Sequence, residues 1–159
     1  MSATSMSRPA SLTRLCVLSF VNQGLVFPMY VVGLFTSIFL GRHTAEEVEA
    51  LVRASATGMF AGDQLEQLVM GGELLRTHGI ALMFVFLLRT LGRFIGVLLM
   101  WHMRPDGFHV YTLSQLLGVL LPMIIGGQPM FSALGFVTAV MWCYLYWSQR
   151  QAITAATAQ

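Results

Sequence analysis

The sequence predicts an all-α polytopic membrane protein: a bundle of four transmembrane helices, with two short amphipathic helices in the first outer loop. Composition is the first reason. Of 159 residues, 56% are hydrophobic and only 10% are charged, whereas soluble domains carry about 25% charged residues. The second reason is that the apolar residues form long blocks, separated by one acidic segment, 42–78, and by two short turns. We therefore interpret the whole chain, 1–159, as a single membrane domain.

Four apolar segments are close to the length that crosses a bilayer. A hydrocarbon core of ~30 Å needs about 20 apolar residues in a helix. The predicted spans cover about 15–41, 80–103, 110–126 and 130–147. The first is too long for the apolar core of a cleaved signal peptide, and no A-x-A-like cleavage site follows it. We expect it to be retained as a span, in which Pro28 kinks or locally relaxes the helix.

The acidic segment between the first two spans carries six of the seven acidic residues. Thr44 and Glu47 have the spacing of a capping box, and apolar positions follow at helical intervals. Asp63 and Glu66 begin a second such pattern, which the pair Gly71–Gly72 should end. This segment should therefore form two short amphipathic helices that lie on the membrane surface or cap the bundle.

Two tight turns join the later spans: RPDG, Arg104–Gly107, and GGQP, Gly126–Pro129. Both favour antiparallel helical hairpins, the first because proline at its second position and glycine at its fourth suit a β-turn. Arginine counting then favours both termini on the cytoplasmic side. This orientation places four arginines inside, against three outside: Arg8, Arg14, Arg104 and Arg150 against Arg42, Arg53 and Arg76.

Two arginines interrupt the second predicted span. Each costs about 2.5–3.5 kcal/mol at the centre of a membrane helix, so both need polar surroundings. Arg89 and Arg93 are four residues apart and share one helix face. Gly92 and Gly96 adjoin that face with a spacing that allows close approach of another helix. We expect this face to turn inward, with both glycines as helix-packing residues.

Other predicted spans offer neutral polar groups at a similar depth. From a rise of ~1.5 Å per residue, Asn22 and Gln23 in the first span lie about 10 Å from the inner boundary. Ser114 and Gln115 in the third span fall at a comparable level. No carboxylate occurs inside a predicted span, and the nearest is Asp106 in a turn. These four residues and the two arginines form the candidate anion or lipid site.

Three interpretations of the arginine pair are open. Carbonyls, amides or lipid headgroups reached by snorkelling would make the arginines structural. A lipid phosphate, a carboxylated metabolite or a carboxylate on a partner helix would make them a binding site. Catalysis is the third, but the sequence contains no nucleophile–base pair, Walker loop or HExxH motif. We therefore expect no catalytic residue.

Metal and cofactor sites are not indicated. His102 and His109 flank a turn, but their spacing matches no standard zinc motif. Cys16 and Cys143 fall within or at the edge of spans, where small apolar packing is the ordinary role of cysteine. We therefore expect neither a metal nor a cofactor. The formal charge of +2 is too small to indicate a nucleic-acid partner.

The block GRFIGVLLMWHMRPDGFHVYTLSQLLGVLLPMII, Gly92–Ile125, resembles a pattern in uncharacterised small four-span integral membrane proteins of bacteria. In that pattern a glycine-rich span ends in Met-Trp, turns through glycine and an aromatic residue, and resumes with tyrosine and glutamine. The matching positions are Met100, Trp101, Gly107, Phe108, Tyr111 and Gln115. His102 and Arg104 stand where such proteins tend to carry lysine. The resemblance implies a hairpin and a bacterial inner membrane, but no activity.

Three functions are compatible with these features. The first is a non-enzymatic membrane protein that packs with lipid, with a second copy of itself or with another membrane protein. In that case the Arg89/Arg93 face serves as an anion or lipid-phosphate site. The second is a small transporter or channel subunit whose arginine face lines a path for an anionic solute. The third is a membrane-embedded enzyme acting on lipid-soluble substrates.

Overall fold

The computed structural model describes residues 9–56, 58–60, 62–127 and 132–157, which are entirely helical apart from turns. Its helices are α1 (Ala10–Leu40), α2 (Ala45–Ala56), α3 (Asp63–Trp101), α4 (Asp106–Gly126) and α5 (Ala133–Thr157). Within these described ranges, α1, α3 and α4 are long and apolar enough to cross a membrane. The fold is therefore all-α, with three membrane-capable helices. The fourth predicted span and the turn Gly126–Pro129 fall partly outside the described residues.

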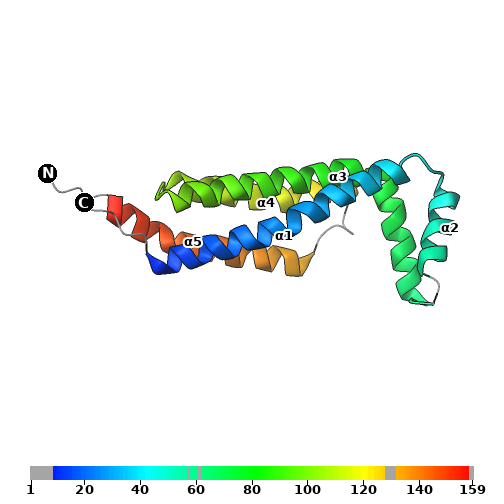
Figure 1. Ribbon diagram of the computed structural model, residues 1–159, viewed down its shortest axis with the longest axis horizontal. Helices are drawn as coiled ribbons and strands as arrows, with labels where there is room; N and C mark the ends of the chain where they lie inside the picture. Colours follow the sequence, from blue (N-terminus) through cyan, green and yellow to red (C-terminus); the bar gives the residue numbers. More distant parts are fainter. Residues whose placement is uncertain (1–8, 57, 61, 128–131, 158–159) are drawn as a thin grey trace.

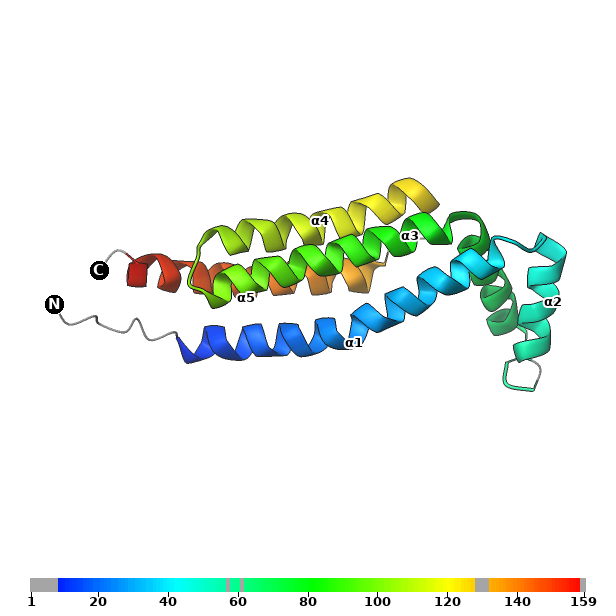
Figure 2. The same ribbon diagram turned by 45° about the horizontal axis from the view of Figure 1, so that its top comes forward.

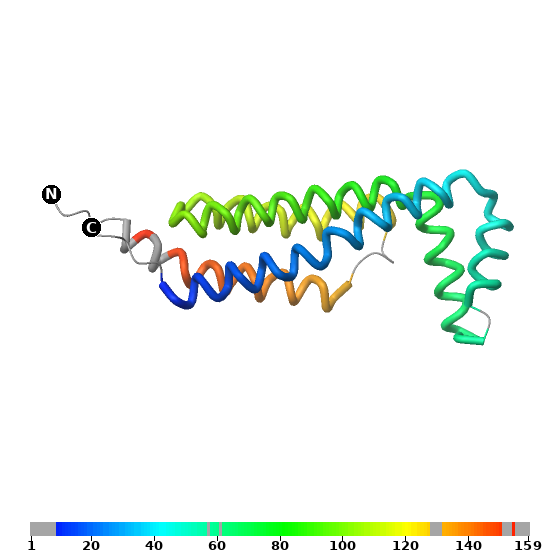
Figure 3. The backbone as a smooth tube through the Cα atoms, viewed as in Figure 1, coloured from blue at the N-terminus to red at the C-terminus, as the bar shows by residue number. Residues whose placement is uncertain are grey.

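An elongated bundle and a hairpin make up the molecule (Figures 1 and 2). Helices α1, α4, α5 and the later part of α3 run along the long axis, while α2 and the beginning of α3 form an antiparallel hairpin across one end. Figure 3 shows α3 changing direction between the hairpin and the bundle. We call α2 and the first part of α3, residues 63–78, the outer hairpin.

The prediction of a second separate loop helix ending at Gly71–Gly72 is wrong, because α3 continues through both glycines to Trp101. Gly72 is buried where α2 crosses α3. A Cβ at this position would lie 3.0 Å from Cγ2 of Val52 and 3.3 Å from Cγ1 of Val48. Glycine here allows a close approach of two helices, and packing outweighs its weak helix propensity.

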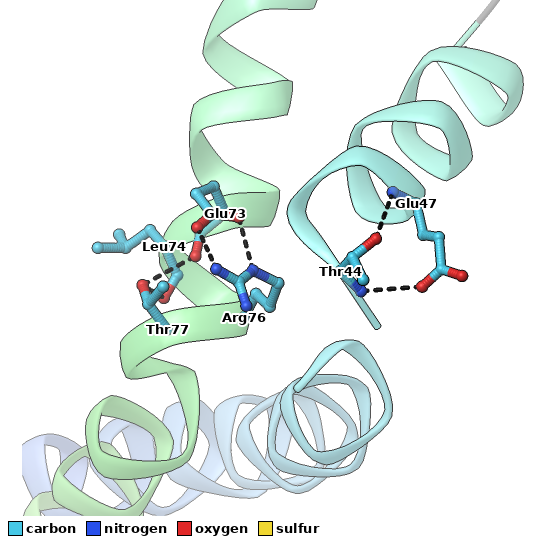
Figure 4. A network of polar contacts seen from close by, with 6 residues as sticks. All are labelled: Thr44, Glu47, Glu73, Leu74, Arg76 and Thr77. Carbon is cyan, nitrogen blue, oxygen red and sulfur yellow. Dashed lines mark hydrogen bonds and ion pairs between the residues drawn. The ribbon is translucent and has the colours of Figure 1, made fainter. Parts of the chain in front are cut away.

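The capping residues of the outer hairpin form the pairs shown in Figure 4. The backbone N–H of Glu47 donates to Oγ1 of Thr44 at 3.3 Å, and the N–H of Thr44 donates to Oε2 of Glu47 at 2.8 Å. This reciprocal capping box satisfies donors that the first turn of α2 would otherwise leave free. Arg53 of α2 also contacts Glu66 of α3, with Nη2 2.9 Å from Oε1.

A bidentate ion pair lies on α3 just before the predicted span (Figure 4). Nε and Nη2 of Arg76 donate to the two carboxylate oxygens of Glu73 at 2.7 and 2.6 Å. Hydrogen bonding from Arg76 lowers the pKa of the Glu73 carboxyl below its ordinary value. Exposed ion pairs of this kind are worth little individually. The pair therefore orients the end of the outer hairpin more than it stabilises the fold.

The opposite end of the bundle holds the main apolar core. Its buried side chains come from α1, α3, α4 and α5: Leu12, Cys16, Val97, Met100, Tyr111 and Tyr146. The hydroxyl of Tyr146 donates to the carbonyl of Leu15 at 3.0 Å and lies 2.7 Å from Oγ of Ser19. Because Ser11 also bonds to Gln149, the start of α1 and the later part of α5 are joined at this end.

The outward surfaces of the bundle helices are strongly apolar. Met29, Val32 and Phe35 of α1 are each more than 60% exposed, and Ile124 of α4 is 77% exposed. Soluble monomers rarely expose contiguous apolar patches of more than a few hundred Å². An apolar exterior around a bundle with polar interior groups is what a bilayer solvates.

Candidate functional site

Arg89 and Gln115 join α3 to α4 through a short chain of hydrogen bonds. Nε and Nη2 of Arg89 donate to Oε1 of Gln115 at 3.2 and 2.6 Å. Nε2 of Gln115 then donates to the hydroxyl of Tyr111 at 3.1 Å. The amide therefore accepts from the guanidinium and donates to the phenol, which fixes its orientation. Gln115 thus binds the edge of the Arg89 guanidinium that carries Nε and Nη2. The remaining N–H groups of the guanidinium point away from Gln115.

Gly118 provides the space in which the Arg89 side chain lies. A Cβ on this glycine would be 2.7 Å from Cγ of Arg89 and closer still to Cδ. Gly118 follows Gln115 by three residues, so both lie on the same face of α4. The side chain of Arg89 therefore crosses α4 at a glycine before its guanidinium reaches the amide.

Arg93 lies one turn further along α3 and is almost completely buried, with 9% of its surface exposed. Its guanidinium carbon is 5.6 Å from the centre of the Tyr111 ring, within the range of a cation–π contact. Its Nε has no hydrogen-bond partner among the described residues. A buried guanidinium with a free N–H is costly unless another acceptor reaches it.

A cavity of about 480 Å³ lies beside both arginines. Arg89, Arg93, Gln115 and Asn22 supply its polar wall. The remaining wall comes from α1, α5 and the residue before α5: Leu18, Ser132, Leu134, Gly135, Thr138, Ala139 and Trp142. Small-molecule sites commonly occupy about 300–1,000 Å³. The structure therefore brings two guanidiniums, two amides and one hydroxyl side chain of α5 to a space of ligand size.

No carboxylate lines this cavity among the described residues. The acidic residues nearest in sequence are Glu73, in the outer hairpin, and Asp106, at the start of α4. Two like charges four residues apart repel each other. A negatively charged group in the cavity would relieve that repulsion and supply the acceptors that Arg93 lacks.

The remaining predicted site residues occupy other places. Ser114 donates to the carbonyl of Val110 at 2.7 Å and faces Gly92 across the α3–α4 contact. Gln23 is 3% exposed, and neither its amide nitrogen nor its oxygen has a partner in the described structure. It is not among the residues that line the cavity. Asn22 and Gln115 therefore line the cavity, whereas Ser114 belongs to helix packing.

Gly96 lies where the backbones of α3 and α4 approach each other closely. A Cβ there would lie 2.7 Å from the backbone nitrogen of Tyr111 and 2.9 Å from the carbonyl oxygen of Gly107. Only a residue without a side chain allows two backbones to approach this closely. The tight contact sets the register in which Gln115 faces Arg89.

Sequence reasoning missed several contributors to this site, among them Gly118, Thr138 and Trp142. Gly118 carried one usable signal, because it lies three residues after Gln115 in an apolar span. Thr138 and Trp142 carried none, since their position depends on how α5 packs. In the described part of the chain, no three His, Cys, Asp or Glu side chains come together in a way that could hold a metal ion.

Comparison of the chain with protein-family models, curated proteins and solved structures found no match. The resemblance to four-span bacterial membrane proteins therefore stays a prediction.

Proposed function

We propose that the protein is a non-enzymatic, multi-pass membrane protein that binds an anionic group on Arg89 and Arg93. The group is a phosphate or a carboxylate. The single observation that supports this proposal is that both guanidiniums border one cavity in which the described residues place no carboxylate. Charge-assisted hydrogen bonds to guanidinium are strong in such surroundings, and arginine suits planar, bidentate recognition of carboxylate and phosphate.

Partial satisfaction of the arginines favours binding over a purely structural role. Gln115 offers one amide oxygen, and Arg89 already uses it twice. Arg93 has the face of Tyr111 but lacks an acceptor for its Nε. Two arginines that served only to join helices would be expected to have their N–H groups paired. An anion between them supplies the missing acceptors.

The proposed setting is the inner membrane of a bacterium, with α5 as the fourth span and both termini in the cytoplasm. The length of α5, 25 residues, and the hydrogen bond from Ser11 to Gln149 support this topology. That bond brings the beginning of α1 and the later part of α5 to one end of the bundle, as an even number of spans requires. The outer hairpin then lies on the periplasmic side, and lipids or a further membrane protein are the expected partners.

Native mass spectrometry tests the anion site directly. The wild-type protein, released from mild detergent, should carry an anionic adduct that Arg89→Gln/Arg93→Gln loses. Arg53→Gln/Arg76→Gln is the matched control, because it removes two positive charges from the outer hairpin and should keep the adduct. Equal adducts on all three proteins would contradict the proposal, and so would their absence from wild type saturated with phosphatidic acid or a long-chain fatty acid.

A transport pathway for an anionic solute is a second candidate. The observation that favours it is that Arg89 and Gly135 border the cavity described above and also a second one of about 140 Å³. A continuous water path predicts that Gly135→Cys, with Cys16 and Cys143 replaced by serine, reacts with an impermeant thiol reagent in sealed vesicles. Protection of that cysteine from both sides would exclude the pathway.

A further inference from the structure

Two of the helices that line the arginine cavity, α1 and α5, are joined by hydrogen bonds near the ends that carry the chain termini. The hydrogen bonds between α1 and α5 in the described structure involve Tyr146 and Gln149 of α5, with partners between Ser11 and Ser19 on α1. Towards the start of α5, every residue from Ala133 to Thr138 is exposed. The first two turns of α5 therefore pack loosely, and the cavity lies beside them.

The residues at the rim of the cavity also face the outside of the bundle. Leu18 of α1 is 54% exposed and Leu134 of α5 is 78% exposed, although both line the cavity. Thr138, which lines it as well, is exposed too. A residue that contributes to both the cavity wall and the outer surface marks an opening. The cavity therefore opens sideways, between α1 and α5, at a level where the surrounding surface is apolar.

The route towards the termini is closed. Tyr146, fully buried, fills the space between α1 and α5 and is held by Leu15 and Ser19. Its ring lies 4.7 Å from that of Tyr111, centre to centre. The apolar core that contains both tyrosines separates the arginines from that end of the bundle. A water-soluble anion that came from that end would have to pass this core.

We propose that the ligand of the Arg89/Arg93 site is an anionic amphiphile that enters from the bilayer through the opening between α1 and α5. This inference rests on the anion site proposed above. The phosphate or carboxylate head lies at the arginines and Gln115, while the hydrocarbon tail leaves past Leu18 and Leu134 into the membrane. The positive charge of the two arginines matches the anionic head of such a molecule, and the apolar side chains at the opening match its hydrocarbon tail.

Trp142 offers a direct probe because it lines the cavity. We would keep it as the sole tryptophan by Trp101→Phe/Trp147→Phe and follow its fluorescence. Two of the quenchers, dibromostearate and a brominated phosphatidic acid, carry the two head groups. The other two are the methyl ester of dibromostearate, which has no charge, and iodide, an anion that has no tail. Saturable quenching by either anionic amphiphile, with little by the ester or iodide, is the expected result.

Two variants and one control variant make the result specific. Arg89→Gln/Arg93→Gln should weaken the saturable quenching by about ten-fold or more, the effect of losing charge-assisted hydrogen bonds. Thr138→Phe should narrow the opening and weaken it without touching the arginines, whereas Val140→Phe, exposed on α5 but outside the cavity lining, should leave it unchanged. If Arg89→Gln/Arg93→Gln does not fold, the comparison of Thr138→Phe with Val140→Phe still tests the proposed opening.

The outcomes separate this inference from the anion site itself. Quenching by iodide as strong as that by dibromostearate, and dependent on the arginines, would keep the anion site but overturn entry from the bilayer. Equal quenching in the Thr138→Phe and Val140→Phe variants would also overturn the proposed opening. Arginine-independent quenching by all four compounds would refute both the inference and the proposed function.

Discussion

Replacing Gly96 with alanine should loosen the contact between α3 and α4. The added Cβ would lie 2.7 Å from the backbone nitrogen of Tyr111 and 2.9 Å from the carbonyl oxygen of Gly107. Ordinary contact begins near 3.4 Å, so α4 must move away by about 0.7 Å. Both neighbours are backbone atoms of a regular helix, which no rotamer change can displace. The strain therefore falls on the whole helix contact.

The magnitude follows from two opposing effects. Overpacking of a close contact costs about 1–3 kcal/mol. Alanine also favours a helix over glycine by about 1 kcal/mol, which offsets part of that cost. We expect a net loss of about 0–2 kcal/mol in the free energy of unfolding relative to wild type, and of about 1–3 kcal/mol relative to a glycine-to-alanine change that makes no new contact. Gln115 moves with α4, so its hydrogen bonds to Arg89 should lengthen as well.

Gly24→Ala is the matched control, because a Cβ at Gly24 would meet no neighbouring atom within 4 Å. Both substitutions gain the same helix propensity, so their difference isolates the contact. Equilibrium unfolding in mixed micelles of a mild detergent and dodecyl sulfate, followed by near-ultraviolet circular dichroism, measures both. We expect Gly24→Ala to be at least as stable as wild type. If Gly96→Ala were as stable as Gly24→Ala, the close α3–α4 contact described here would be wrong.

Three further predictions concern other contacts. Gly118→Ala should push Arg89 out of its place on α4 and weaken binding of an anionic lipid several-fold, with little change in helix content. Native mass spectrometry measures the binding, and unchanged binding would show that the Arg89 side chain does not need this space. Tyr146→Phe should lower the free energy of unfolding by about 1 kcal/mol through loss of the bond to Leu15, which a detergent unfolding curve can detect; a change within error would deny that bond a stabilising role. The folded-state pKa of Glu73 lies below the ordinary value of 4.5, so the contribution of Glu73 to stability is present above pH 4.5 and is lost as the pH falls through the lowered value. Hydrogen exchange of the outer hairpin should accelerate over that acid range in wild type and much less in Glu73→Gln. Identical exchange profiles in the two proteins would contradict this coupling.

Local sequence signals predicted most of the helices. Long apolar blocks gave the positions of α1 and α4, and the capping box of Thr44 and Glu47 marked the start of α2 within one residue. Such signals act within a few residues and depend little on tertiary packing. The shared face of Arg89 and Arg93 was likewise a matter of spacing alone. Both arginines border one cavity in the structure.

Features set by contacts between distant segments could not be predicted in the same way. Gly71–Gly72 has the composition of a helix end, yet the helix continues because α2 packs against Gly72. Both α1, which carries Gln23, and α4, which carries Gln115, pack against α3, so the partner of Arg89 depended on how each helix is rotated about its axis. Gln115 bonds to the arginine, whereas Gln23 is buried without a hydrogen-bond partner among the described residues. Depth in a membrane does not distinguish them, because it fixes height but not direction.

The continuity of α3 from Asp63 to Trp101 makes the molecule sensitive to its surroundings in a mechanical sense. Seventeen residues separate Gly72 from Arg89, which corresponds to about 25 Å of helix without a loop to absorb movement. Bilayers of different thickness tilt their helices to different degrees. A change in the tilt of the bundle part of α3 would shift both arginines, and it would also move the outer hairpin, which the same helix carries beyond its change of direction. We therefore expect the geometry of the cavity to respond to membrane thickness.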